Sequence, residues 1–212
     1  MLSIAVSGRT GRVGRCVLEE ISHRTDLQEV LDIEKADVVI DFSVPEATVH
    51  CARACAAHQI PLITGTTGLS EHEQAIIQQA SETIPILQAS NMAWGVQVLQ
   101  QLIAHVHQML PPTWDVHIIE AHRRDKRDVP SGTALALGRA LAPRAVHYSS
   151  LRMGDTPGEH QVWFVSEGER LILQHQVSDR RPFAIGALQA AQWIVNQSPG
   201  LYSLMDKDRQ LP

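Results

Sequence analysis

The sequence predicts an α/β protein with two domains, a parallel doubly wound sheet and an α+β domain whose open sheet is mostly antiparallel. Across residues 2–88, short apolar segments typical of strands alternate with helix-like segments, and the connections between them are short. This alternation is typical of a parallel sheet with helices on both faces. Across residues 161–177, apolar and polar residues alternate with a period of two, which is typical of an antiparallel sheet with one covered face.

The composition is that of an ordinary globular protein with length for one or two domains. The chain has 212 residues, of which 44% are hydrophobic and 19% are charged. Its net charge of −5 argues against a general nucleic-acid binder. The N-terminus has neither a basic region nor a long apolar run, so we expect no signal peptide, no membrane span and a cytoplasmic location.

The three cysteines are few, odd in number and irregularly spaced. Cys16, Cys51 and Cys55 therefore indicate a reducing compartment rather than a disulfide framework. Cys51, Cys55 and His58 share one face of a predicted helix, and a metal site there is the alternative to simple packing. Small residues on the same face favour close packing of this helix against the sheet, so we expect no metal.

A glycine-rich loop follows the first predicted strand. Residues 2–6 form an apolar run, residues 8–14 have the spacing G-x-x-G-x-x-G, and apolar residues then recur at helical spacing. Between a strand and a helix, such glycines let the backbone approach a pyrophosphate, and the helix N-terminus faces the anion. The loop therefore predicts a Rossmann-like dinucleotide site.

The segment that should hold the adenine ribose is short. Dinucleotide sites usually carry an acidic residue at the end of a second strand, ~20 residues past the glycine loop. Here only residues 23–36 separate the first helix from the next clear strand, and the candidate acids are Asp32 and Glu34. We expect a trimmed adenosine end, and the sequence does not distinguish NADH from NADPH.

Two more polar turns follow predicted strands. Residues 65–68, Gly-Thr-Thr-Gly, follow one strand, and residues 89–91, Ala-Ser-Asn, follow the next. Ligands of parallel sheets bind at the carboxyl ends of the strands, so these turns and the glycine loop together predict a cofactor crevice.

Two helices of this half are predicted to begin with capping boxes, in which a serine and a glutamate three residues later satisfy the first backbone N–H groups. Ser43 with Glu46 forms the first box, and Ser70 with Glu73 forms the second.

A dense set of ionisable residues follows the strand predicted at residues 114–120. Histidine exchanges protons readily near neutrality, so His122 is the natural proton donor for a nicotinamide-dependent reduction. Lys126 can stabilise a developing anion, and Arg123 can hold a carboxylate. A Pro-Ser-Gly-Thr turn, with Ser131 as the expected N-cap, then presents backbone N–H groups at a helix start. This arrangement predicts a small anionic substrate such as a dicarboxylate.

These motifs resemble those of the dihydrodipicolinate reductases, also called 4-hydroxy-tetrahydrodipicolinate reductases. The family signature E-x-H-H-x-x-K-x-D-x-P-S-G-T-A is matched by residues 120–134. Further similarity lies at residues 7–14, 39–43, 65–68, 90–91, 151–154, 157–160, 168–169 and 183–187.

The resemblance implies an NADH- or NADPH-dependent enzyme of lysine and diaminopimelate biosynthesis, usually a homotetramer. It would reduce 4-hydroxy-tetrahydrodipicolinate, with loss of water, to tetrahydrodipicolinate. Residues 1–92, with 183–212 returning to them, would bind the dinucleotide, and residues 93–182 would bind substrate and form the oligomer.

The resemblance also assigns roles to individual residues. His122 and Lys126 would be catalytic, and Arg123, Gly132 and Thr133 would bind substrate. The residues implied to bind the cofactor are Gly8, Arg9, Thr10, Gly11, Arg12, Val13, Gly65, Thr66, Thr67, Ala89, Ser90, Asn91 and Met92.

Three features depart from the family pattern. Arg123 replaces the second histidine of the signature, residues 91–96 differ from the family's Asn-Phe-Ser-x-Gly-x, and residues 23–36 omit most of the unit that reads the ribose. The alternatives are a catalytically weak homologue that senses a nucleotide or a dicarboxylate, and an oxidoreductase for another dicarboxylate imine. We expect no nucleic-acid partner, because Asp125 and Asp128 interrupt the basic patch.

Overall fold

The computed structural model describes residues 1–208, which form two compact units. The first unit contains Met1–Ala93 and the chain from Arg180 onward, and the second is Trp94–Asp179. In the part of the chain that the structure describes, no helix is long and apolar enough to cross a membrane.

The first unit is built on a six-stranded sheet in the order β10-β5-β4-β3-β1-β2, and every neighbouring pair is parallel. Its strands are β1 (Leu2–Ser7), β2 (Leu27–Glu29), β3 (Val38–Asp41), β4 (Leu62–Thr64), β5 (Pro85–Gln88) and β10 (Gly200–Tyr202). Its helices are α1 (Arg12–Ser22), η1 (Ile33–Lys35), α2 (Pro45–His58), α3 (Glu71–Ser81), α6 (Arg181–Ile194) and α7 (Leu204–Asp208). The predicted parallel, doubly wound sheet is confirmed.

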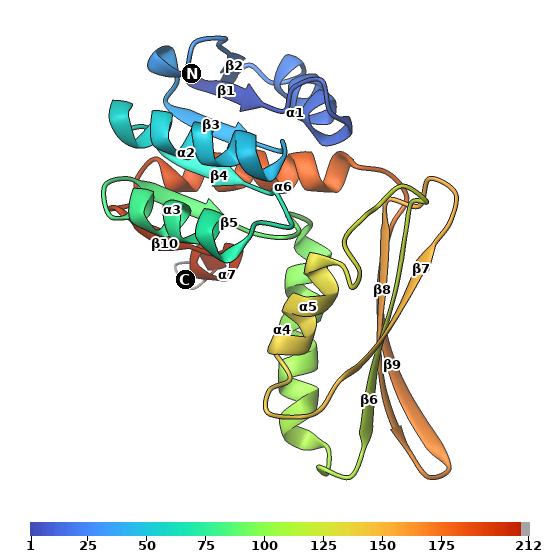
Figure 1. Ribbon diagram of the computed structural model, residues 1–212. Coiled ribbons are helices and arrows are strands. Elements are labelled where there is room, and N and C mark those ends of the chain that lie inside the picture. Colours follow the sequence, from blue (N-terminus) through green and yellow to red (C-terminus); the bar gives the residue numbers. More distant parts are fainter. Residues whose placement is uncertain (209–212) are drawn as a thin grey trace. The chain divides into compact units, whose positions relative to one another are not determined.

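Helices cover both faces of this sheet (Figure 1). α1 and α6 pack on one face through an apolar cluster that includes Val17 and Ile194, and α2 and α3 pack on the other through a cluster that includes Cys55 and Ile77. All four residues of the central strand β3 are buried, which explains its nearly continuous apolar sequence. Cys51 also lies in the second cluster, as packing predicts.

One of the two predicted capping boxes is confirmed. At α3, Ser70 Oγ accepts a bond from the backbone N–H of Glu73, whose carboxylate accepts one from the N–H of Ser70. The other box is wrong, because α2 begins after Val44 and has no side-chain cap. Ser43 instead donates its hydroxyl hydrogen to Asp41, since a fully buried carboxylate requires donors more strongly than a helix end in contact with water.

The second unit is a four-stranded sheet in the order β7-β6-β8-β9. Its elements are α4 (Trp94–Met109), β6 (Asp115–His122), α5 (Gly132–Arg139), β7 (His147–Arg152), β8 (Gly158–Ser166) and β9 (Glu169–Val177). Only the β6–β7 pair is parallel, so the predicted, mostly antiparallel sheet is confirmed.

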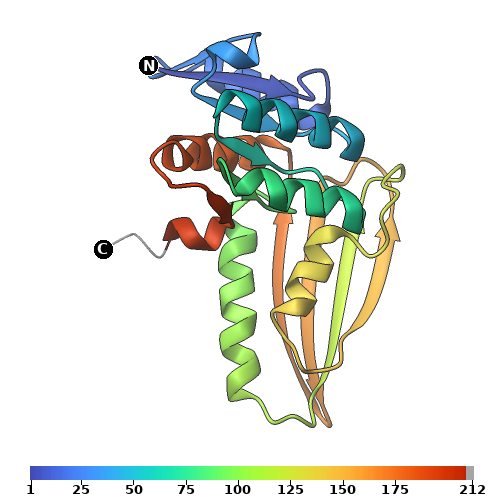
Figure 2. The ribbon, with the colours of Figure 1, turned by 60° about the vertical axis from the view of Figure 1, so that its left-hand side comes forward.

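Both helices of this unit lie on the same face of the sheet (Figures 1 and 2). Ile103 of α4 and Leu137 of α5 pack against Ile118 of β6 and Phe164 of β8, and all four side chains are fully buried. The alternation of buried and accessible residues along β8 therefore reflects one covered face. Buried polar residues near the ends of β6 and β8 point to this same face, on which the helices pack.

Candidate active site

The glycine loop after β1 requires glycine at two positions. Gly8 has a φ of +73°, and a Cβ built on it would lie 2.4 Å from the carbonyl oxygen of Phe42. A Cβ on Gly14 would lie 2.2 Å from the carbonyl oxygen of Gly8, so the loop and α1 approach as closely as their backbones allow. Larger residues at either position would displace the chain.

The loop ends at a helix N-terminus that suits an anion. Gly11 is the N-cap residue of α1, and as a glycine it has no side chain with which to cap the helix. The first backbone N–H groups of a helix have no intrahelical acceptor, so they suit a ligand phosphate, and the helix dipole favours negative charge there.

The other predicted cofactor residues follow neighbouring strands of the same sheet. Residues 65–67 follow β4 and residues 89–92 follow β5, so both groups lie at the carboxyl edge that also carries the glycine loop. Within the second group, Asn91 accepts a 2.9 Å hydrogen bond from the backbone N–H of Ala93, while the side chain of Met92 is buried in the core. Met92 is 1% exposed, so its side chain belongs to the core of this unit rather than to the cofactor edge.

A buried carboxylate holds two of these strand ends together. Asp41, at the end of β3, accepts hydrogen bonds from the hydroxyls of Thr48 at 2.6 Å, Thr64 at 3.0 Å and Thr66 at 3.1 Å. Its carbonyl oxygen accepts a 2.9 Å bond from the N–H of Gly65. The turn at residues 65–67 is thereby fixed at the edge of the sheet.

The acidic residue at the end of the second strand is Glu29, which was not among the predicted residues. Its Oε1 atom lies 2.6 Å from Nη2 of Arg9, in the glycine loop. The predicted candidates lie elsewhere: Asp32 pairs with Lys35, and Glu34 pairs with His58 at 3.6 Å. β2 ends at Glu29, so this residue, rather than Asp32 or Glu34, is the acid at the strand end.

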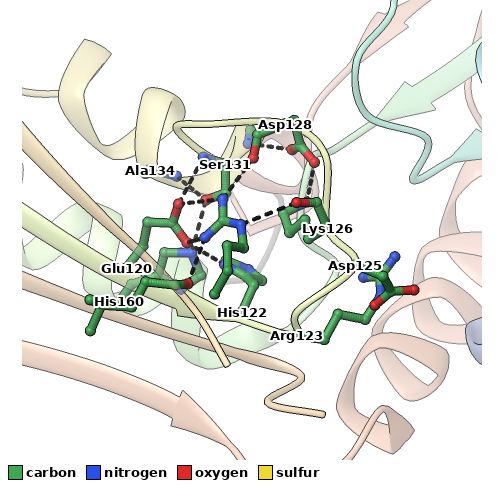
Figure 3. Close-up of polar contacts among 12 residues, drawn as sticks. Glu120, His122, Arg123, Asp125, Lys126, Asp128, Ser131, Ala134 and His160 are labelled. Atoms are coloured by element: carbon green, nitrogen blue, oxygen red, sulfur yellow. Dashed lines mark hydrogen bonds and ion pairs between the residues drawn. The ribbon is translucent and has the colours of Figure 1, made fainter. Parts of the chain in front are cut away.

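In the second unit, three buried polar residues share one face of the sheet. Glu120 and His122 are two residues apart on β6, and His160 on β8 stands opposite Glu120 in the antiparallel pair. The three residues are 1%, 6% and 1% exposed. The rings of His122 and His160 pack edge to face, with their centroids 5.1 Å apart (Figure 3).

Glu120 is the centre of this cluster. It accepts a hydrogen bond from Nδ1 of His122, two bonds of 2.8 and 2.9 Å from the guanidinium of Arg152, and a 3.3 Å bond from the backbone N–H of Ser131. Burial by itself would raise the pKa of Glu120, but the hydrogen bonds from His122 and Arg152 outweigh it and hold that pKa well below its usual range. Glu120 is therefore ionised at neutral pH.

The loop from Arg123 to the start of α5 carries the remaining predicted residues. Nζ of Lys126 lies 2.7 Å from Oδ1 of Asp128, whose Oδ2 accepts a 3.3 Å bond from the N–H of Gly132. Burial opposes ionisation of Asp128, but the hydrogen bond and charge of Lys126 outweigh it and lower the pKa of Asp128. Nε of Arg123 lies 2.8 Å from Oδ1 of Asp125 (Figure 3).

The predicted N-cap of α5 is confirmed. Oγ of Ser131 accepts a 3.2 Å bond from the N–H of Ala134, and Thr133 in the first turn is buried. Arg124 and Arg127, by contrast, are exposed. The structure thus brings His122, Lys126, Gly132 and Thr133 into one unit with the buried Glu120.

Comparison with known families agrees with these observations. Family models described as "Dihydrodipicolinate reductase, N-terminus" and "Dihydrodipicolinate reductase, C-terminus" match residues 24–92 and 95–207. The chain belongs to the dihydrodipicolinate reductase family.

Named relatives of this family are similar over most of their length. The 4-hydroxy-tetrahydrodipicolinate reductase of Thermomicrobium roseum is 39% identical over 256 residues, covering 97% of this chain and 99% of the relative. The 4-hydroxy-tetrahydrodipicolinate reductase of Myxococcus xanthus is 39% identical over 202 residues, covering 85% of this chain and 74% of the relative.

A solved dihydrodipicolinate reductase has the same fold. The dipicolinate-bound enzyme from Paenisporosarcina sp. TG-14 has a TM-score of 0.74 at 19% identity, and the match covers 96% of this chain and 97% of that one. At this identity the likeness concerns the fold, which is that of a dihydrodipicolinate reductase.

Two acidic residues of the family signature were assigned no role from the sequence, but in the structure they bond the candidate site residues. Glu120 and Asp128 were part of the matched motif, and Arg152 and His160 lay in similar segments further on. The one available signal was the spacing of Glu120 and His122, because residues two apart on a strand share a face. Nothing in the sequence indicated that Arg152 stands opposite His122 on the parallel neighbour β7.

Proposed function

We propose that this protein is an NAD(P)H-dependent 4-hydroxy-tetrahydrodipicolinate reductase of lysine and diaminopimelate biosynthesis. The substrate, NAD(P)H and one proton give tetrahydrodipicolinate, NAD(P)⁺ and water. The observation that carries the proposal is the buried His122, held by Glu120 beside Lys126 and the N-terminus of α5 in a member of this family.

His122 is the proton donor in this proposal. Its Nδ1 is held by Glu120, so the proton that can leave is the one on Nε2. Bound NADH or NADPH supplies the hydride. Lys126 stabilises the charge that develops as the proton is transferred.

The substrate carboxylates are bound by Lys126, by the N–H groups of Gly132 and Thr133, and by Arg123. The position of Asp128 supports this assignment, because its carboxylate already accepts bonds from both Lys126 and Gly132. The same cation and N–H group are thus suitable for a substrate carboxylate. Arg123 retains the ability to hold a second carboxylate in place of the family's histidine.

The first unit binds the cofactor, with residues 1–92 and 183–212 as its nucleotide domain. The fit rests on the N-terminus of α1, whose N-cap residue Gly11 has no side chain, and on the glycine loop that leads into it from β1, an arrangement that suits a pyrophosphate. Glu29 holds the adenine ribose, because it ends the strand beside β1 and contacts the glycine loop through Arg9.

Residues 93–182 form the substrate and oligomerisation domain of a cytoplasmic homotetramer. The outer face of its sheet supports an oligomer, because Leu151 and Ile172 are large apolar residues left exposed there. Sedimentation velocity of the purified chain tests this part, and a monomer at micromolar concentration would contradict it.

The activity is tested by mixing the folded protein with substrate generated by the preceding synthase and with NADH or NADPH. Loss of nicotinamide absorbance that depends on the substrate is the expected result. A folded preparation that oxidises neither cofactor would overturn the proposed function.

A further inference from the structure

A buried, fully bonded carboxylate lies directly behind the proposed proton donor. Both oxygens of Glu120 accept hydrogen bonds: Oε2 from His122 and Arg152, and Oε1 from Arg152 and the N–H of Ser131 (Figure 3). Its side chain has no exposed surface, and that of Arg152 is 16% exposed. Replacing a buried ion pair by apolar residues is often neutral or stabilising, so stability alone is a weak reason for one here.

The carboxylate dictates which nitrogen of His122 carries a proton. An ionised carboxylate only accepts hydrogen bonds, so the Nδ1 atom that contacts it must be the donor. Neutral His122 then has its lone pair on Nε2, and an added proton binds at Nε2. A Cβ built on Gly158 would lie 3.2 Å from this Nε2, so the glycine leaves space where a side chain would crowd it.

Arg152 also binds the backbone of the loop that carries Lys126. Its Nη2 donates a 2.7 Å bond to the carbonyl oxygen of Asp128, and its Nε donates a 3.3 Å bond to that of Lys126. One guanidinium therefore fixes the carboxylate behind His122 and the backbone beside Lys126.

We propose that Glu120, held by Arg152, is a positioning residue that keeps a proton on Nδ1 of His122 and reserves Nε2 for proton transfer to the substrate. The inference rests on the proposed function, in which His122 is the donor. Glu120 itself touches neither substrate nor cofactor, and it acts through the orientation and tautomer of the imidazole.

Two matched double variants test the inference. Both carry Arg152→Met, so that no unpaired guanidinium remains buried. One adds Glu120→Gln, which keeps an acceptor oxygen at position 120; this double variant is called the Glu120→Gln pair. The other adds Glu120→Leu, which has similar volume but no acceptor, and is called the Glu120→Leu pair. Glu169→Gln, an exposed carboxylate on β9, is the surface control.

The first measurement does not depend on turnover. In protein labelled with ¹⁵N-histidine, long-range proton–nitrogen correlations identify the tautomer of His122 at a pH where the ring is neutral, with His122→Gln for assignment. We expect the Nδ1–H form in the wild type, in the Glu120→Gln pair and in the control. The Glu120→Leu pair should move mainly to the Nε2–H form.

The second measurement is steady-state kinetics with the synthase-generated substrate. Relative to the Glu120→Gln pair, the Glu120→Leu pair should lose kcat by about 10²- to 10³-fold, with KM within about threefold, because proton transfer suffers and substrate binding does not. Circular dichroism checks that both pairs are folded.

The two measurements separate the possible failures. An unchanged tautomer in the Glu120→Leu pair overturns the inference, and so does a changed tautomer with kcat within twofold of the Glu120→Gln pair. A wild type that is folded but inactive overturns the proposed function instead, and the spectra still decide whether Glu120 controls the tautomer.

Discussion

Nη2 of Arg9 lies 2.6 Å from Oε1 of Glu29, so an ion pair joins the glycine loop to the end of β2. β2 has three residues, and the single turn of η1 follows it where a longer chain would carry a full helix. Although this region is short, the acid remains at the strand end where dinucleotide sites hold the ribose hydroxyls.

We expect Glu29→Ala to raise the KM for NADH by about 10- to 100-fold, because hydrogen bonds to a charged group contribute ~1.5–3 kcal/mol. The KM for NADPH should change much less, since a carboxylate at this position disfavours a 2′-phosphate. Asp32→Asn, at the exposed pair with Lys35, is the matched control and should leave both values unchanged. Equal effects of Glu29→Ala on the two cofactors would contradict the assignment.

His122→Gln should lower kcat by about 10²- to 10⁴-fold, the usual contribution of a positioned general acid. Binding of pyridine-2,6-dicarboxylate, measured by calorimetry, should change by less than about threefold, since the carboxylate-binding groups remain. His105→Gln, on the exposed face of α4, is the control and should have wild-type kcat. A loss of analogue affinity that matches the loss of kcat would assign His122 to binding instead.

Lys126 and Arg127 are adjacent cations that we expect to differ in role. Lys126 is 12% exposed in its side chain and pairs with Asp128, whereas Arg127 is exposed. Lys126→Gln should lower kcat/KM at least about 100-fold, because a buried cation that meets a carboxylate is lost. Arg127→Gln should remain within about twofold of the wild type, and comparable losses in both variants would mean that general positive charge, rather than one site, binds the substrate.

A comparison of alanine substitutions at Gly8 and Gly68 distinguishes the cost of backbone strain from the cost of a steric clash. Both have positive φ, +73° and +81°, but a Cβ at Gly8 meets the Phe42 carbonyl while one at Gly68 meets nothing within 4 Å. Gly68→Ala should therefore cost about 1 kcal/mol of unfolding free energy, and Gly8→Ala about 3 kcal/mol or more. Urea unfolding of the two variants measures the difference, and equal costs would show that the close approach at Gly8 is relieved.

His160 should make the protein less stable in acid. Burial, and next the nearby charge of His122, lowers the pKa of His160 to about 3. The unfolded chain binds this proton at a pKa of about 6.5, so the unfolding free energy falls by up to about 1.4 kcal/mol per pH unit as the pH drops from about 6.5 towards 3.

His160→Gln should weaken this dependence, as measured by urea unfolding at several pH values between 7 and 4.5. His105→Gln, an exposed histidine, is the control and should keep the wild-type slope. The same slope in His160→Gln as in the wild type would mean that the buried imidazole does not contribute.

Local patterns predicted much of the fold because they depend on near neighbours. The Ser70–Glu73 capping box, the N-cap Ser131 and the alternation along β8 were all correct, and each involves residues within a few positions of one another. The strand β10 and helix α7 were not predicted. β10 joins the sheet only by pairing with β5, which lies more than a hundred positions earlier in the sequence.

The two errors have different causes. Ser43 has a sound capping pattern, but it donates its hydroxyl hydrogen to the buried Asp41, two residues earlier at the end of β3. Glu29 was overlooked because the sequence does not mark where a three-residue strand ends, and its partner Arg9 is 20 positions away.

The sequence by itself determined the family and most of the order of strands and helices. It also determined the residues His122, Lys126 and Gly132 that the proposed reaction uses, because these lie within one continuous signature. Only the tertiary structure decided which buried groups hold these residues in place. Arg152 reaches Glu120 through the parallel pairing of β6 with β7, and His160 reaches His122 through the antiparallel pairing of β6 with β8. Strand register, which depends on packing across the whole sheet, sets those contacts, and no local pattern encodes them.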